Sequence, residues 1–102
     1  FAAPLMAQLG YPTLFCNSLD VAPDGRISTY RLRQENGKLH AVRAFRSIGC
    51  TVYAAGDSYN DLAMIREADR GAFFTPPASI VAENRDLPVC TTYDELFAFL
   101  TA

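Results

Sequence analysis

The sequence TVYAAGDSYND, residues 51–61, combines two patterns that decide the fold. Residues 51–55 are a short apolar run, which is typical of a strand that is buried on both faces. Residues 56–61 then form a polar turn with two carboxylates, Asp57 and Asp61. A buried strand followed by a polar turn and a helix is the unit from which parallel sheets with covering helices are built.

Short helices and strands are expected to alternate on both sides of this stretch. Apolar residues at a spacing of three predict an amphipathic helix over residues 38–48, ended by Gly49. The expected elements after the turn are a helix over 62–68, strands at 72–74 and 88–91, helical turns at 79–84, and a last helix opened by a capping box at 92–95. The fold class is therefore predicted to be α/β, with a parallel sheet and flanking helices.

The first third of the chain is predicted to add a helix, a strand and a hairpin. A helix over residues 2–9 ends at Gly10, and no cap residue precedes it, so the chain is expected to start in mid-domain. Residues 13–16 are interpreted as a short buried strand. Residues 18–33 are predicted to form a β-hairpin around a Pro-Asp-Gly turn. With neither repeats nor a linker, residues 1–102 are predicted to be one partial domain with this hairpin inserted and protruding.

Composition excludes several classes of protein. Half of the 102 residues are apolar and 20% are charged, which excludes a disordered chain. The net charge of −2 argues against a nucleic-acid partner, and no apolar run reaches the length of a membrane span. Three cysteines, Cys16, Cys50 and Cys90, lie in or beside apolar segments. They are interpreted as buried, reduced thiols of a cytoplasmic protein.

The turn after residue 55 carries the residues best suited to chemistry. An Asp at the end of a strand can hold Mg²⁺, which prefers carboxylate oxygens, water and substrate phosphate as ligands. Asn60 can donate to a phosphate oxygen, and Asp61 can accept from a lysine or a metal-bound water. The competing interpretation is an ordinary capped helix, because Asp and Asn are common at N-caps. Two carboxylates and an amide together after a buried strand favour a functional site.

Residues 55–61 resemble the fourth motif of the haloacid dehalogenase-like (HAD) phosphatases. The resemblance is closest to the phosphoserine phosphatase branch, which includes the phosphoserine–homoserine phosphotransferases, and residues 4–14, 30–34 and 92–96 support it. It implies a Rossmann-like core. It also implies a Mg²⁺-dependent phosphatase or phosphotransferase that acts on phosphoserine or a similar small phosphorylated metabolite.

The resemblance also implies roles for individual residues. Asp57 matches the aspartate that ligates Mg²⁺, and Asn60 and Asp61 match the pair that supports the phosphate and the metal shell. Lys38 matches the lysine of the third motif, which neutralises the phosphate and the nucleophile; alone it could equally be a solvated surface charge. Lys38 and Asp61 are therefore the candidate catalytic residues. Arg31 and Arg33 could reach a substrate carboxylate by bidentate pairing, or they could equally be exposed hairpin charges; Arg33 is the candidate for substrate or phosphate binding.

The sequence also departs from the family pattern. The first motif of the family, an Asp-x-Asp that supplies the nucleophile, does not occur in these residues, and neither does the second. The chain is thus expected to be a C-terminal portion that is inactive alone, with a sheet that lacks its N-terminal strands. Open sheet edges predict a homodimer or association with the missing segment. The alternative is an inactive remnant that serves as a binding or oligomerisation module.

Overall fold

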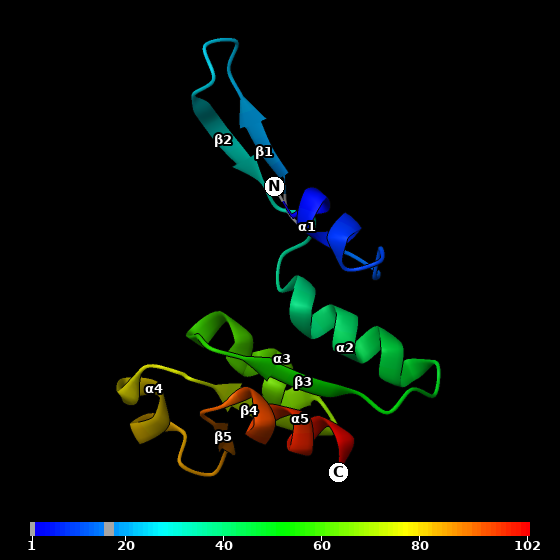
Figure 1. Ribbon diagram of the computed structural model, residues 1–102, viewed down its shortest axis with the longest axis vertical. Coiled ribbons are helices and arrows are strands. Elements are labelled where there is room, and N and C mark those ends of the chain that lie inside the picture. Colours follow the sequence, from blue (N-terminus) through cyan, green and yellow to red (C-terminus); the bar gives the residue numbers. More distant parts are fainter. Residues whose placement is uncertain (1, 16–17) are drawn as a thin grey trace. The chain divides into compact units, whose positions relative to one another are not determined.

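The computed structural model describes residues 2–15 and 18–102, which fall into two compact units. The first unit is Phe1–Gly37 and the second is Lys38–Ala102 (Figure 1). That residues 1–102 belong to one partial domain with an inserted hairpin stays a prediction.

The first unit contains a helix and a hairpin, as predicted. Its elements are α1 (Ala3–Gln8), β1 (Ser18–Val21) and β2 (Ile27–Arg31). Strands β1 and β2 pair antiparallel and form a two-stranded sheet. In the turn between them Gly25 has a φ of +86°, and the Arg26 amide donates to Asp24 Oδ1 at 3.0 Å. Helix α1 starts without a side-chain cap and ends before Gly10, whose φ is +83°.

The strand predicted at residues 13–16 is wrong for the residues that the structure describes there. Residues 13–15 form no regular element and are exposed, and Cys16 lies outside the described residues. A strand must satisfy its backbone N–H and C=O groups through a partner. Neither of the two described sheets includes these residues, so an apolar run alone does not make a strand here.

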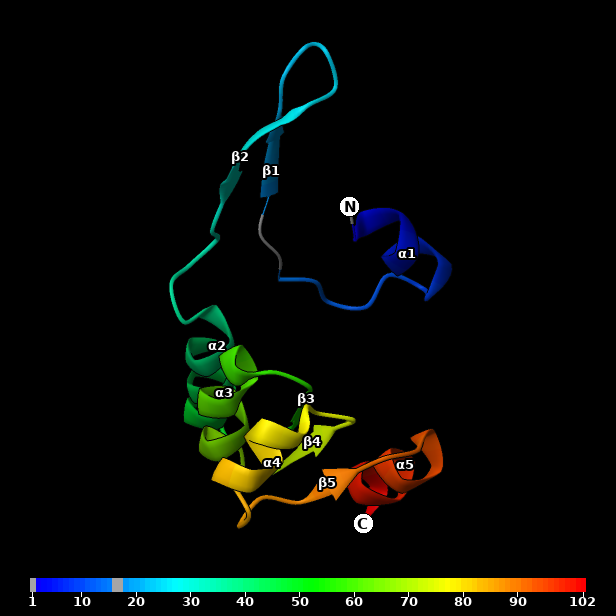
Figure 2. The same cartoon turned by 90° about the vertical axis from the view of Figure 1, so that its left-hand side faces the viewer.

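The second unit is an α/β structure with a parallel three-stranded sheet, as predicted. The strands are β3 (Tyr53–Gly56), β4 (Arg70–Phe74) and β5 (Val89–Cys90), hydrogen-bonded in the order β3-β4-β5. The helices are α2 (Gly37–Ser47), α3 (Leu62–Glu67), α4 (Ala78–Glu83) and α5 (Tyr93–Thr101). Figure 2 shows α3 on one side of the sheet and α5 on the other.

Alternating residues of β4 pack against the helices on the two faces. Phe73 is fully buried with Ile65 of α3 and Ile80 of α4, and these three residues form a cluster at the centre of the hydrophobic core. A Cβ placed on Gly71 would lie 2.1 Å from the carbonyl oxygen of Ile65, so glycine is required for this close helix–strand approach. On the opposite face the ring of Phe74 stacks on Tyr93 of α5, with centroids 5.0 Å apart.

The start of α5 differs in one detail from the predicted capping box. The Glu95 amide donates to Thr92 Oγ1 at 3.1 Å, as expected of an N-cap. The Glu95 carboxylate, however, accepts from the backbone amide of Thr91 at 2.6 Å, one residue earlier than a capping box requires. The helix therefore begins where the sequence predicts, with its second cap bond shifted.

The cysteine prediction is confirmed for one residue and wrong for another. Cys90 is a buried free thiol, and burial raises its pKa above the ordinary value. Cys50 is free but exposed, because it lies in the irregular stretch after α2 and precedes β3. Within the described ranges, no helix is both long and apolar enough to cross a membrane.

Candidate functional site

The polar turn lies at the carboxyl end of β3, where parallel sheets place their ligands. Strand β3 ends at Gly56, Asp57 and Ser58 follow, and a 3-10 helix, η1 (Tyr59–Asp61), leads directly into α3. The turn is thus held between the buried strand and the helix that packs on it. The segment predicted to carry the chemistry is one continuous strand–turn–helix.

Asp61 organises this turn from the inside. The residue is 4% exposed, and its Oδ2 atom accepts hydrogen bonds from the backbone amides of Asp57 at 3.0 Å and Ser58 at 3.2 Å. The hydroxyl of Ser58 donates to the same oxygen at 3.2 Å. A carboxylate that accepts several amide donors fixes the backbone around it. Asp61 therefore sets the conformation of the turn that carries Asp57.

Gly56 makes room for this buried carboxylate. A Cβ placed on Gly56 would lie 2.4 Å from Cγ and 2.4 Å from Oδ2 of Asp61, far inside van der Waals contact. Its φ is not in the left-handed region, so the requirement for glycine is steric. The buried position of Asp61, the last residue of the motif, therefore explains why the motif needs a glycine at position 56.

Lys38 reaches the turn from another element. It lies in the first turn of α2, and its Nζ forms an ion pair with Oδ1 of Asp61. Its side chain is 54% exposed while that of Asp61 is 5% exposed, so the ammonium group has solvent on the side away from the carboxylate. The two candidate catalytic residues, 23 positions apart in the chain, are in direct contact.

The environment of Asp61 keeps its carboxyl group ionised. Burial pushes its pKa upward, but the hydrogen bond and charge of Lys38 and the amides of Asp57 and Ser58 outweigh burial and lower the pKa below the ordinary value. Asp61 is therefore a permanent anion at neutral pH, and both of its oxygens are engaged.

Helix α2 is held in place at its far end, which positions Lys38. Arg46 donates to the carbonyl oxygen of Glu67 at 3.0 Å and pairs with Asp69 at 3.3 Å. Asp69 in turn accepts from the amide of Val52, just before β3, at 2.8 Å. These contacts tie α2 to the end of α3 and to the strand that leads into the turn.

Asp57 and Asn60 have the exposure expected of ligand-binding residues. Asp57 is exposed, and in the described part of the chain nothing donates a hydrogen bond to its carboxylate, which suits it to bind a cation. Asn60 is also exposed, and its Oδ1 lies beside the Ser58 hydroxyl, whose one proton can be donated either to this oxygen or to Asp61. The amide N–H groups of Asn60 can donate to other partners. Among the described residues, no group of three or more His, Cys, Asp or Glu could hold a metal. Asp57 could supply one carboxylate ligand to a hard cation.

Arg33 lies in the first unit. Its guanidinium lies over the ring of Phe15, 5.0 Å from the centroid, and donates to Gln34 at 3.4 Å. Its proposed contact with a substrate anion stays a prediction.

Sequence reasoning missed a hydrogen bond that holds the turn from the outside. Tyr59, between the two motif carboxylates, donates its hydroxyl to Glu83 at the end of α4, and this bond raises the pKa of the phenol above its ordinary value. Nothing in the sequence pairs these residues, which are 24 positions apart. Such a bond could have been predicted only if α4 were already known to lie beside the turn. Tyr59 in the motif and Glu83 in the last turn of α4 would then be an obvious donor–acceptor pair.

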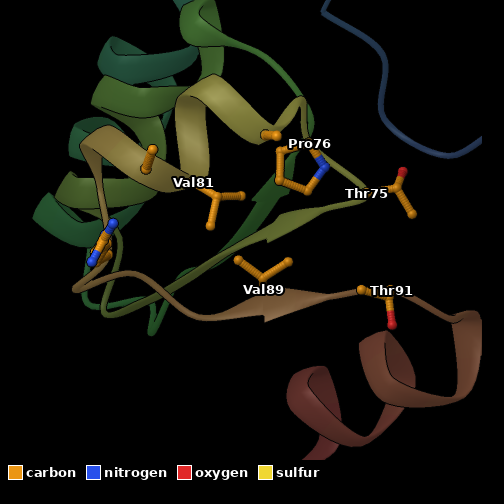
Figure 3. Close-up of a pocket in the computed structure, with 8 residues that line it drawn as sticks. Thr75, Pro76, Val81, Val89 and Thr91 are labelled. Atoms are coloured by element: carbon orange, nitrogen blue, oxygen red, sulfur yellow. The ribbon is translucent and has the colours of Figure 1, made fainter.

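A separate hollow lies between α4 and β5. This cavity of about 730 Å³ is bounded by Thr75 and Thr91, which follow β4 and β5, by Val81 and Val89, and by the charged Arg85 (Figure 3). It includes none of the predicted site residues, so the candidate site is the turn after β3.

Fold and turn together define a class: an α/β protein with an ionised, lysine-paired carboxylate and a free carboxylate at the end of a parallel strand. Comparison with known proteins finds two curated relatives. Over 96 residues, 94% of its length, the chain is 45% identical to the phosphoserine phosphatase of Pseudomonas syringae pv. tomato. It is 44% identical, also over 96 residues, to phosphoserine phosphatase ThrH of Pseudomonas aeruginosa. No family model matches the chain.

These relatives confirm the resemblance to phosphoserine phosphatases that the motif predicted. The matched region spans 40% of the first relative and 47% of the second, so the chain corresponds to less than half of either protein. The activity of the complete relatives is therefore a matter for proposal.

Proposed function

We propose that this chain is the C-terminal part of a Mg²⁺-dependent phosphatase or phosphotransferase with the HAD-type Rossmann-like core. Its substrate would be phosphoserine or a similar small phosphate ester. The observation that carries the proposal is the contact between Lys38 and the buried Asp61 beside the free carboxylate of Asp57. The two phosphoserine phosphatases that it resembles support the same chemistry.

Each residue of the turn would have a separate task. Asp57 would hold Mg²⁺, and the bound ion supplies charge neutralisation and orientation to a phosphate group. Lys38 keeps donors free on its solvent side and can bind a phosphate oxygen while Asp61 fixes its position. Asn60 can donate to a second oxygen. Asp61 itself binds the turn amides and Lys38, which keeps Asp57 and the lysine in register.

The chain contributes the metal and phosphate side of this site without the nucleophile. Phosphoryl transfer through an aspartyl phosphate needs a carboxylate in line with the phosphorus. The Asp-x-Asp motif that would supply it does not occur in the 102 residues, and Asp61 is buried and doubly engaged. We therefore expect the activity to require a further segment that carries that motif.

Binding at Asp57 can be tested without activity. MgCl₂ is titrated into the ¹⁵N-labelled chain up to about 50 mM, because a site with one carboxylate ligand is weak. Amide shifts at residues 57–61 are expected, and Asp57→Asn should abolish them. Asp24→Asn, which removes an exposed carboxylate from the hairpin turn, should leave them unchanged. Absence of shifts near Asp57 in the unmodified chain would count against the proposal.

A second function, a non-catalytic binding or oligomerisation module, is favoured by the exposed apolar residues of the hairpin. Adding a segment with the Asp-x-Asp motif separates the two. If phosphoserine turnover appears and is lost with Lys38→Ala, the chain is part of an enzyme. If the completed protein binds but does not turn over, the module interpretation holds.

A further inference from the structure

Tyr59 joins the candidate site to a helix that is distant in sequence. It is the first residue of η1, between Asp57 and Asp61, and its hydroxyl donates to Glu83, the last residue of α4. Tyr59 is 51% exposed and Glu83 is exposed as well, so removal of the hydroxyl would leave no cavity in the core. The bond therefore acts on the position of the turn rather than on the packing of the core.

The acceptor of this hydrogen bond extends from a helix that is anchored in the core. Ile80 of α4 is 1% exposed and belongs to the buried hydrophobic cluster. Asn84, which follows Glu83, is also buried. Its side-chain amide donates to the carbonyl oxygen of Ile80 at 3.0 Å, and its Oδ1 accepts from Arg66 of α3 at 2.8 Å. Helix α4 cannot shift without disturbing these contacts, so Glu83 offers the tyrosine a fixed acceptor.

Asp57 depends on the backbone of the turn for its position. Its carboxylate accepts no hydrogen bond from the residues that the structure describes, so no side-chain contact places it. The backbone itself has two anchors. Inside, Oδ2 of Asp61 accepts from the amides of residues 57 and 58; outside, the hydroxyl of Tyr59 is bound to α4. The turn that carries Asp57 is therefore fixed from both sides.

We propose that Tyr59 is a positioning residue of the candidate site, whose hydrogen bond to Glu83 closes the turn against α4 and so fixes the backbone that carries Asp57. The ligand in this inference, Mg²⁺ with the phosphate group that it would orient, rests on the proposed function. Without the bond, η1 is held from the inside only, by Asp61, and the turn can open toward solvent. An open turn no longer presents the carboxylate of Asp57 beside Lys38, so it binds the cation less well.

Tyr59→Phe removes the hydroxyl and keeps the ring. Loss of one hydrogen bond to a carboxylate should favour the open turn about tenfold. If the turn is open in about a tenth of the unmodified molecules, the closed fraction falls from about 0.9 to about 0.5. The Mg²⁺ dissociation constant, measured from the amide shift of Asp57 in the ¹⁵N-labelled chain, should then about double. Without Mg²⁺, the amide shifts of residues 57 and 58 should already differ from those of the unmodified chain.

Three further variants separate positioning from general stability. Glu83→Ala should reproduce both effects of Tyr59→Phe, although it lies 24 positions away in the sequence. Glu83→Gln keeps an acceptor oxygen and should behave like the unmodified chain. Thr92→Ala removes the cap of α5, so it destabilises the fold without a contact to the turn. It should leave both the shifts of residues 57 and 58 and the dissociation constant unchanged.

The metal-free shifts decide the proposal independently of the proposed function. Unchanged shifts at residues 57 and 58 in Tyr59→Phe and Glu83→Ala would overturn it. So would an Mg²⁺ dissociation constant for Tyr59→Phe equal to that of the unmodified chain. If the unmodified chain shows no Mg²⁺ shifts at all, the proposed function fails. In that case, metal-free shifts that move in Glu83→Ala but not in Glu83→Gln would still support the positioning role of Tyr59.

Discussion

Replacing Gly56 by alanine tests whether the buried carboxylate of Asp61 holds the site together. The new Cβ would lie 2.4 Å from Cγ and Oδ2 of Asp61 and 2.5 Å from its Cβ. Asp61 is only 4% exposed and is bound to the amides of Asp57 and Ser58 and to Lys38, so it cannot simply rotate away. The methyl group and the present hydrogen bonds of Asp61 are mutually exclusive.

The expected loss of stability follows from these contacts. Forcing one methyl group into a packed position costs about 1–3 kcal/mol. If the carboxylate moves, the two turn amides lose their acceptor, at about 1–3 kcal/mol for a buried unpaired group. A total near 3 kcal/mol is a large part of the roughly 5–15 kcal/mol that stabilises a domain. It corresponds to a fall in Tm of about 15 °C.

Thermal unfolding followed by circular dichroism measures this change, and Gly49→Ala is the matched control. Gly49 has a φ of +91° with nothing within 4 Å of its Cβ position, so alanine there costs only the backbone strain of about 1–2 kcal/mol. Amide shifts at Asp57 and Ser58 should move in Gly56→Ala and stay fixed in Gly49→Ala. If Gly56→Ala lowers Tm no more than Gly49→Ala does, Asp61 is not the rigid centre of the turn.

Three further outcomes are expected. The fold lowers the pKa of Asp61, so the ionised carboxylate stabilises the folded state at every pH above its unfolded pKa of about 4. This stabilisation is lost as the pH falls below that value. Tm should therefore drop more steeply below pH 4 in the unmodified chain than in Asp61→Asn. Thr92→Ala should lower the free energy of unfolding by about 1 kcal/mol in urea titrations while Thr92→Ser retains it, since Oγ1 caps α5. Finally, the chain alone should show no phosphoserine hydrolysis above background with Mg²⁺; turnover abolished by Asp57→Asn would show that the nucleophile has been misplaced.

The second unit was predictable because each element carries its own signal. The period of three in residues 38–48 and the apolar run before Gly56 correctly predicted the helix α2 and the strand β3. On the apolar face of the helix, however, Val42 is buried while Phe45 and Ile48 are exposed. The capping threonine at residue 92 marked the start of α5 to the residue. Local pattern was sufficient wherever the packing partner was close in sequence.

The first third of the chain shows where local pattern fails. Residues 13–15 are as apolar as β3, yet they form no strand among the described residues, since a strand also depends on a neighbour that the pattern does not specify. The prediction of the hairpin was correct because each strand pairs with its neighbour in the sequence: the Pro-Asp-Gly turn brings β1 and β2 together. The exposure of Cys50 was not predicted either. Apolar neighbours in the sequence do not show whether a side chain faces the interior or the solvent.

At the site, the sequence predicted which residue types gather in the turn, but it did not predict that the two carboxylates have different environments. Asp57 and Asp61 look equivalent in a polar turn, and burial separates them: one is exposed, the other 4% exposed beneath the strand end. The cause is the 3-10 helix, which turns Asp61 back toward Gly56 so that it accepts from the amides of residues 57 and 58. An inner carboxylate that is paired with Lys38 is poorly placed to bind a cation as well, so we expect the proposed Mg²⁺ binding to depend on Asp57. Loss of Asp57 should therefore affect binding with little change in stability, whereas loss of Asp61 should affect both.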